Sequence, residues 1–305
     1  MKILWMLMVV GVISVEAHAR CDSREKVIRL GLAPQSDTPA RQKAVASLRA
    51  AINLELQGRA CLKIETDDKL FASALSVTAL QSGKIDMAIP SYADLGAFAA
   101  DFQVFDLPFA FRDYRAVQRF NILVGDRLKQ PLVKFGVLPL AQWHSHFDQI
   151  TAKRAVVRPD DLAGLKTLPS TSPNSSQLIK SLDAVEQTVP RAQVAASIKD
   201  GRVEAQMSDW LPLKDDKTAR VHAGVTQTNH AYHGFTLLVS QAWWDGLRSR
   251  IKKPLSELIS RVSKQSNFDA EQRHINAKRG VIGSGAPVRC LTNRQRNAWI
   301  AKLKP

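Results

Sequence analysis

The chain has 305 residues, 45% of which are hydrophobic, and its 43 Lys and Arg residues outnumber its 28 Asp and Glu residues. That length can form two modest domains, each with a hydrophobic core of its own. The formal net charge of +15 is spread over much of the chain instead of forming one dense basic tract. Nucleic-acid-binding proteins usually carry such a tract with interleaved aromatic residues, so we expect no nucleic-acid partner.

The first residues have the pattern of an export signal. Lys2 precedes an apolar run over residues 3–15, and an Ala-His-Ala motif that ends at Ala19 follows. The run is too short to span a bilayer, and small residues at this spacing are typical of a signal-peptidase site. We therefore expect residues 1–19 to be a signal peptide that is cleaved near Ala19. The mature protein is then expected in the periplasm and not embedded in the membrane.

Strand and helix patterns alternate after this segment. Thr38 followed by Pro39 is typical of a capped helix start, and Gly58 marks the end of that helix. A strand–helix–strand–helix–strand order implies right-handed crossovers and a parallel sheet that is covered on both faces. Besides the first helix, we expect strands over residues 27–33, 62–66 and 85–90 and a second helix over residues 71–81.

The three cysteines allow one disulfide in an oxidising compartment. Cys21 precedes the first expected strand, and Cys61 precedes the second. If those strands are parallel neighbours, their starts lie on the same side of the sheet, which favours a Cys21–Cys61 pair. A Cys61–Cys290 pair is the alternative, and neither spacing resembles a zinc-binding module.

One short stretch, W-H-S-H-F-D-Q-I-T, contains two histidines and a carboxylate. Side chains alternate across a strand, so His144, His146 and Asp148 are expected to point to one face. Imidazole and carboxylate groups ligate Zn²⁺, Ni²⁺ or Cu²⁺, and His230 and His233 are further candidates. A divalent metal ion is therefore the one cofactor that we consider, although such spacing also arises by chance.

Catalytic motifs give no support for an enzyme. The sequence contains no phosphate-binding P-loop, no G-x-S-x-G nucleophile motif and no H-E-x-x-H zinc motif. The serine-rich stretch that follows Leu168 has the composition of a loop. We expect no enzymatic activity.

Five segments, taken in chain order, carry a resemblance to a known family. Residues 81–89 read Q-S-G-K-I-D-M-A-I, residues 104–114 read V-F-D-L-P-F-A-F-R-D-Y, and residues 159–166 read P-D-D-L-A-G-L-K. Residues 198–206 and the T-N-H-A-Y motif at residues 228–232 follow. These segments are similar to motifs of the solute receptors of tripartite ATP-independent periplasmic (TRAP) transporters, the DctP-like family. The resemblance covers nearly all of the mature chain.

The resemblance implies an α/β protein with the type II periplasmic-binding-protein fold. Two α/β lobes are then joined by crossover strands near residues 145–148 and 233–238, and a ligand binds in the cleft between them. A helix over residues 247–278 is expected to span both lobes, and a capped helix over residues 292–303 to close the chain. The expected lobe boundaries are 20–145 with 234–273 for lobe I, and 146–233 with 274–305 for lobe II.

Members of the family mostly bind organic acids through two arginines and an asparagine. In this chain Asp148 occupies the position of the first arginine, and His146 that of a preceding glycine. Leu168 occupies the position of the second arginine. Ser208 replaces the asparagine, and Met207 replaces an adjacent glutamate. The resemblance therefore implies that the usual carboxylate contacts are missing here.

We expect an extracytoplasmic solute-binding protein of a TRAP-type transporter whose ligand is not a simple dicarboxylate. Its partners would be a small-molecule solute and the TRAP membrane subunits. Arg191 could hold an anion from a new direction, because a guanidinium can fork onto a carboxylate. The alternative is a divergent receptor fold that acts as an exported accessory, metal-binding or partner-binding protein. The candidate cleft residues are Ser91, His146, Asp148, Leu168, Arg191, Met207, Ser208 and Trp210.

Overall fold

The computed structural model describes residues 21–33, 38–71, 75–172 and 174–303. The expected signal peptide, residues 1–19, lies outside these ranges. Within them, the longest helices are too polar to cross a membrane.

The first of two sheets has the strand order β2-β1-β3-β10-β4. β1 pairs in parallel with β2 and β3, which confirms the parallel arrangement predicted for the first three strands. β10 then pairs antiparallel with both β3 and β4, so the sheet is mixed. The strands are β1 (Lys26–Leu32), β2 (Ala60–Thr66), β3 (Met87–Ala88), β4 (Val137–Phe147) and β10 (Tyr232–Ser240).

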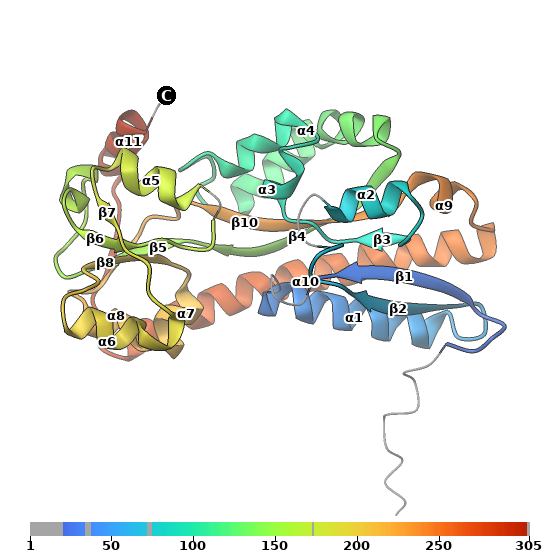
Figure 1. Ribbon diagram of the computed structural model, residues 1–305, viewed down its shortest axis with the longest axis horizontal. Helices are drawn as coiled ribbons and strands as arrows, with labels where there is room; N and C mark the ends of the chain where they lie inside the picture. The colour runs from blue at the N-terminus through green and yellow to red at the C-terminus, as the bar shows by residue number, and fades with distance from the viewer. Residues whose placement is uncertain (1–20, 34–37, 72–74, 173, 304–305) are drawn as a thin grey trace, which may run out of the picture.

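Helices cover both faces of this sheet, as expected (Figure 1). α1 begins as the sequence predicts, because the Thr38 side chain accepts a hydrogen bond from the Arg41 backbone N–H and Pro39 is the first helical residue. One face of the sheet packs on α1 and the long helix α10, and the other packs on α2, α3 and α4. The helices of this lobe are α1 (Pro39–Glu55), α2 (Leu75–Gln81), α3 (Tyr92–Leu95), α4 (Tyr114–Lys134) and α9 (Gln241–Asp245), with a 3₁₀ helix at Ala100–Asp106.

The second sheet has the order β11-β9-β5-β8-β6-β7 and forms the core of the other lobe. Its strands are β5 (Gln149–Ala152), β6 (Lys166–Leu168), β7 (Val185–Glu186), β8 (Ala205–Ser208), β9 (Val225–Gln227) and β11 (Val288–Cys290). Its helices are α5 (Ser175–Ser181), α6 (Val194–Lys199), α7 (Trp210–Asp215), α8 (Thr218–Val221) and α11 (Asn293–Lys302), with 3₁₀ helices at Pro159–Leu162 and Arg191–Gln193.

Two strand connections and one helix join the lobes (Figure 1). β4 of the first sheet leads directly into β5 of the second, with Asp148 between them. The chain returns between β9 and β10, at residues 228–231, slightly earlier than expected, because β10 pairs with β4 along its whole length. α10 (Ser249–Gly283) packs on α1 and β4 of one lobe and on α7 of the other. The predicted two-lobe α/β fold with a lobe-spanning helix is confirmed.

The disulfide is the Cys21–Cys61 pair that the expected strand order favoured. Cys21 and Cys61 form a disulfide with their Cα atoms 5.5 Å apart. β1 and β2 are parallel neighbours, with Val27 opposite Cys61, so both cysteines lie at the same edge of the sheet. Cys290 is free and exposed.

Candidate functional site

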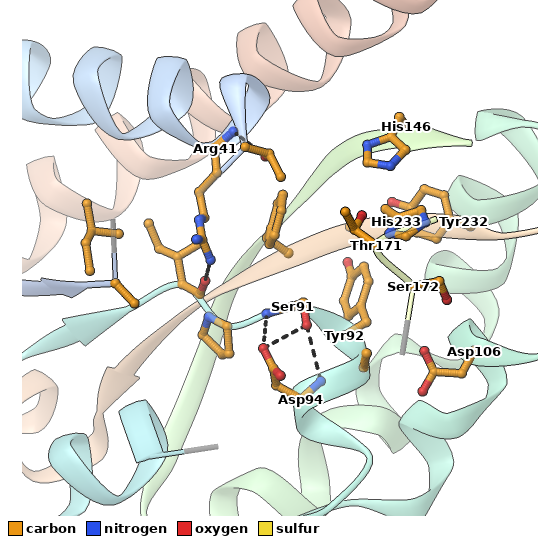
Figure 2. Close-up of a pocket in the computed structure, with 18 of the residues that line it drawn as sticks. Arg41, Ser91, Tyr92, Asp94, Asp106, His146, Thr171, Ser172, Tyr232 and His233 are labelled. Atoms are coloured by element: carbon orange, nitrogen blue, oxygen red, sulfur yellow. Dashed lines mark hydrogen bonds between the residues drawn. The ribbon is translucent and has the colours of Figure 1, made fainter. Parts of the chain in front are cut away.

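Two adjoining cavities lie where the lobes meet. The first, of about 380 Å³, is lined by Arg41 of α1, Ser91 at the start of α3, His233 of β10, and Thr171 and Ser172 of the second lobe. Figure 2 shows Arg41 on one side of this cavity and His146, Tyr232 and His233 on the other. The second cavity, of about 320 Å³, lies toward α7 and α10. Both are lined by Thr38, His146 and Thr171, so together they form one cleft.

A β-bulge in the crossover strands decides which side chains reach the cleft. His233 is paired with His146, but the next residue of β10, Gly234, is paired with His144, so Ser145 is the extra residue on β4. An extra residue reverses the side-chain alternation on that strand. The expectation that His144 and His146 share a face is therefore wrong. His144 points into the core, with its Nδ1 2.7 Å from the Tyr232 hydroxyl.

His146 belongs to a compact cluster of imidazole and carboxylate groups. Its Nε2 lies 3.6 Å from Oδ1 of Asp148 and 3.8 Å from Oδ2 of Asp209. Nε2 of His233 lies 2.9 Å from Oδ2 of Asp148, and the His146 and His233 rings stack with centroids 4.1 Å apart. Ser145 Oγ is 2.9 Å from Nδ1 of His146, which fixes the ring with Nε2 toward the carboxylates.

The charges in this cluster follow from burial and pairing. Burial works against a charge on either member of the Asp148–His233 pair, but their mutual attraction lowers the pKa of Asp148 and raises that of His233. Burial, together with the nearby His233 charge, lowers the pKa of His146 to about 3. Burial raises the pKa of Asp209 to about 6. The Asp148–His233 contact therefore favours the ionised form of both partners, while burial keeps His146 neutral.

A two-lobe α/β fold with a polar cleft at its strand crossover is the architecture of a solute receptor. The model of the DctP family, bacterial extracellular solute-binding protein family 7, matches residues 31–305. The chain belongs to this family. Its members are described as bacterial extracellular solute-binding proteins.

Named members are similar over most of their length. The C4-dicarboxylate-binding periplasmic protein DctP of Vibrio cholerae is 29% identical over 298 residues, which are 97% of this chain and 90% of that protein. A protein of the same name from Rhodobacter capsulatus is 27% identical over 284 residues, 92% of this chain and 84% of that one.

Solved structures of TRAP periplasmic solute-binding proteins share the fold. That of Pseudomonas aeruginosa PAO1, with bound L-malate, has a TM-score of 0.70 and 26% identity and covers 92% of this chain and 98% of its own. That of Ochrobactrum anthropi, with its C-terminus in the ligand-binding pocket, has a TM-score of 0.77 and 22% identity, with coverage of 92% and 89%.

Four of the eight predicted cleft residues line the cavities of this DctP-family protein. Ser91 lines the first cavity, where its hydroxyl donates to Asp94 and caps α3, and His146 lines both cavities. Arg191 and Trp210 line the second. The Arg191 side chain is 75% exposed and lies 3.6 Å from the Asp216 carboxylate, so it is only loosely held.

The other four line neither cavity. Asp148 is 1% exposed and lies behind the histidines. Met207 is packed in the core of the second lobe, and Ser208 is buried opposite Gln149. Leu168 packs against the α6 cluster of apolar residues. Their side chains are short, apolar or already paired, so none of the four is placed to hold a ligand in this cleft.

The structure adds two residues that the sequence analysis missed. The buried Arg41 donates from Nη1 to the carbonyl of Ile89 and lies over the Phe235 ring, with 5.0 Å from its Cζ to the ring centroid. Asp209 caps α7 by accepting from the Leu211 N–H. The available signal was position, because both follow the carboxyl end of a strand, where α/β proteins bind ligands. His230 instead bonds to Thr228, which orders the loop between β9 and β10.

Proposed function

We propose that this chain is the extracytoplasmic receptor of a TRAP transporter and that it captures one small polar solute between its lobes. This proposal rests on the cleft. Its walls come from both lobes, and its floor is formed by the paired crossover strands β4 and β10. Clefts with a few convergent polar groups are the usual sites for small ligands. Family membership and the Cys21–Cys61 disulfide support a periplasmic location, and the family also implies the TRAP membrane subunits as partners.

The side chains of the cleft favour a solute other than a simple dicarboxylate. The relatives named above are called C4-dicarboxylate-binding proteins, and one solved structure holds malate. In this chain Asp148 and Leu168 stand where the family's arginines are expected. A charge pair about 4 Å apart contributes roughly 4 kcal/mol at the dielectric of a partly buried site. A dicarboxylate would therefore lose its main attractions.

Charged side chains of both signs line the first cavity. Arg41 brings a cation to the first cavity, and Asp94 and Asp106 bring carboxylates to the same walls (Figure 2). Burial raises the pKa of Asp106, so this carboxylate can be neutral more readily than usual. Such a pattern suits a solute that combines a single acidic group with hydroxyl or amino groups. Arg41 is the residue that we assign to the acidic group.

Capture is expected to close the cleft by a hinge motion at the crossover. The lobes are joined by the short segments at Asp148 and at residues 228–231, together with α10. A few residues at element ends can absorb such a rotation. A solute that contacts both Arg41 of one lobe and Thr171 of the other would favour the closed form, because both line the same cavity.

Native mass spectrometry of the protein purified without denaturation tests this proposal. We expect one small molecule to be retained, and the same compound, added to stripped protein, to reduce the radius of gyration in X-ray scattering. Arg41→Ala should abolish retention, whereas Arg49→Ala, on the same helix but outside both cavities, should not. A saturating ligand that leaves the radius unchanged would count against a transport receptor.

A further inference from the structure

We propose that the cleft contains a site for one divalent transition-metal ion, such as Zn²⁺ or Ni²⁺. Its ligands are Nε2 of His146, Nε2 of His233 and a carboxylate oxygen of Asp148, and Asp209 supplies the fourth. The first three residues offer ligand atoms that all lie within 4.8 Å of one another. The proposal goes beyond solute capture and does not depend on it.

Three separations in the cluster are close to those of a tetrahedral site. Bonds of 2.0–2.1 Å to a central zinc place neighbouring ligand atoms roughly 3.3 Å apart. The separations involving His146 are 3.6 Å to Asp148 and 3.8 Å to Asp209, and that between His233 and Asp148 is 2.9 Å. The His146 and His233 rings now stack with centroids 4.1 Å apart, so binding requires one ring to turn until both Nε2 lone pairs point at the ion. His144, which was part of the predicted set, is excluded because the bulge at Ser145 turns it into the core, away from the cluster.

Nε2 of His146 faces carboxylates that it does not hydrogen-bond. When Nδ1–H donates to Ser145, the lone pair of Nε2 faces two carboxylates at distances too long for hydrogen bonds. Ser145 thereby acts as the outer-shell group that orients a ligating imidazole. Neutral imidazole and carboxylate are ligands that zinc and nickel prefer.

The charges balance when an ion enters. Two carboxylates offset the double positive charge of the ion. The proton that His233 shares with Asp148 leaves to solvent, because a ligating imidazole nitrogen must be free of its proton. Without an ion, the His233–Asp148 hydrogen bond satisfies both groups. This closed pair is the competing state that an experiment must distinguish.

Calorimetry with Zn²⁺ on the mature chain, free of any affinity tag, tests the site. Cys290→Ser provides the background for every variant, because the exposed thiol could bind the ion itself. We expect one ion per chain, with affinity weakened about 100-fold or more by His146→Gln and by His233→Gln. His274→Gln, which changes another histidine of the second cavity outside the cluster, should bind as tightly as the background.

X-ray absorption of the zinc-loaded Cys290→Ser protein gives a test that needs no further variant. We expect two imidazole ligands with oxygen donors completing the shell. No stoichiometric binding, a shell without imidazole, or binding that survives His233→Gln would overturn the proposal. Solute retention measured in the presence of a chelator tests the receptor function separately, so failure of one leaves the other standing.

Discussion

His146 and His233 stack across the paired crossover strands, with their ring centroids 4.1 Å apart and their planes inclined by 20°. They are direct cross-strand partners, one on β4 and one on β10. Both Nε2 atoms lie near the Asp148 carboxylate: that of His146 faces Oδ1, and that of His233 faces Oδ2. This arrangement joins the two crossover strands at the point where the chain passes between the lobes, so changes here affect both the cleft and the stability of the hinge.

Dicarboxylates should not stabilise this protein. The resemblance implies that Asp148 and Leu168 replace the family's two arginines. On that proposal, succinate, malate, fumarate and 2-oxo acids should give no shift in Tm at millimolar concentration. Thermal unfolding followed by dye fluorescence or circular dichroism measures this directly. A saturable shift would mean that another cation has taken over, and Arg41→Ala and Arg191→Ala would then show which one.

The Asp148–His233 pair should contribute strongly to stability. Removing one partner of a buried pair typically costs about 3–5 kcal/mol, because the other charge remains buried and unpaired. We therefore expect Asp148→Asn to lower the unfolding free energy by about this amount. The double variant Asp148→Asn/His233→Gln should lose less than the sum of the single variants. Urea denaturation with a chelator present measures the four proteins of this cycle, and strict additivity would show that the pair is not coupled.

The stabilisation that Asp148 and His233 give each other should depend on pH. The lowered pKa of Asp148 means that its contribution is present above its unfolded value of 3.8 and is lost as pH falls through the folded value. The raised pKa of His233 means that its contribution is present below its unfolded value of 6.5 and is lost as pH rises through the folded value. Coupling in the cycle should therefore be largest between pH 3.8 and 6.5. Coupling that grows steadily above pH 6.5 would contradict this assignment.

His222 should make the protein sensitive to mild acid. Burial lowers the pKa of His222 from 6.5 to about 4, and its Nδ1 lies 3.2 Å from the Thr151 hydroxyl. Above pH 6.5 the His222 ring is neutral in the folded and the unfolded chain, and the unfolding free energy has its full value. As pH falls from 6.5 toward 4, only the unfolded chain binds the proton, so the unfolding free energy decreases. At about 1.4 kcal/mol per pK unit, the loss approaches roughly 3 kcal/mol. His222→Gln should flatten the fall in unfolding free energy over this range, and an unchanged slope would contradict the assignment.

Gly234 should be intolerant of a side chain. A Cβ at this position would lie 2.5 Å from Cε2 of Tyr92 and 2.6 Å from the Tyr232 hydroxyl oxygen. Gly234→Ala should therefore destabilise the protein by about 1–3 kcal/mol through overpacking, and it should also disturb the cleft wall. Gly283→Ala is the matched control, because no atom lies within 4 Å of a Cβ built there. In a helix that change should stabilise by up to about 1 kcal/mol.

Local signals in the sequence determined much of the fold. Thr38 and Pro39 start α1 and Thr292 caps α11 because their effects act within a few residues. The alternation of strands and helices over the first 90 residues predicted three parallel strands, and this order placed Cys21 beside Cys61. The family motifs then identified the two lobes and located the crossover near residue 146.

Only the tertiary structure decided which side chains form the site. No local pattern predicts the bulge at Ser145, because the bulge exists only where β4 pairs with β10, some 90 residues further along the chain. That one extra residue turns His144 into the core and leaves His146 against His233 and Asp209. Strand spacing fixes alternation within a strand. Long-range pairing fixes the register, and a shift of one residue moves a side chain to the opposite face.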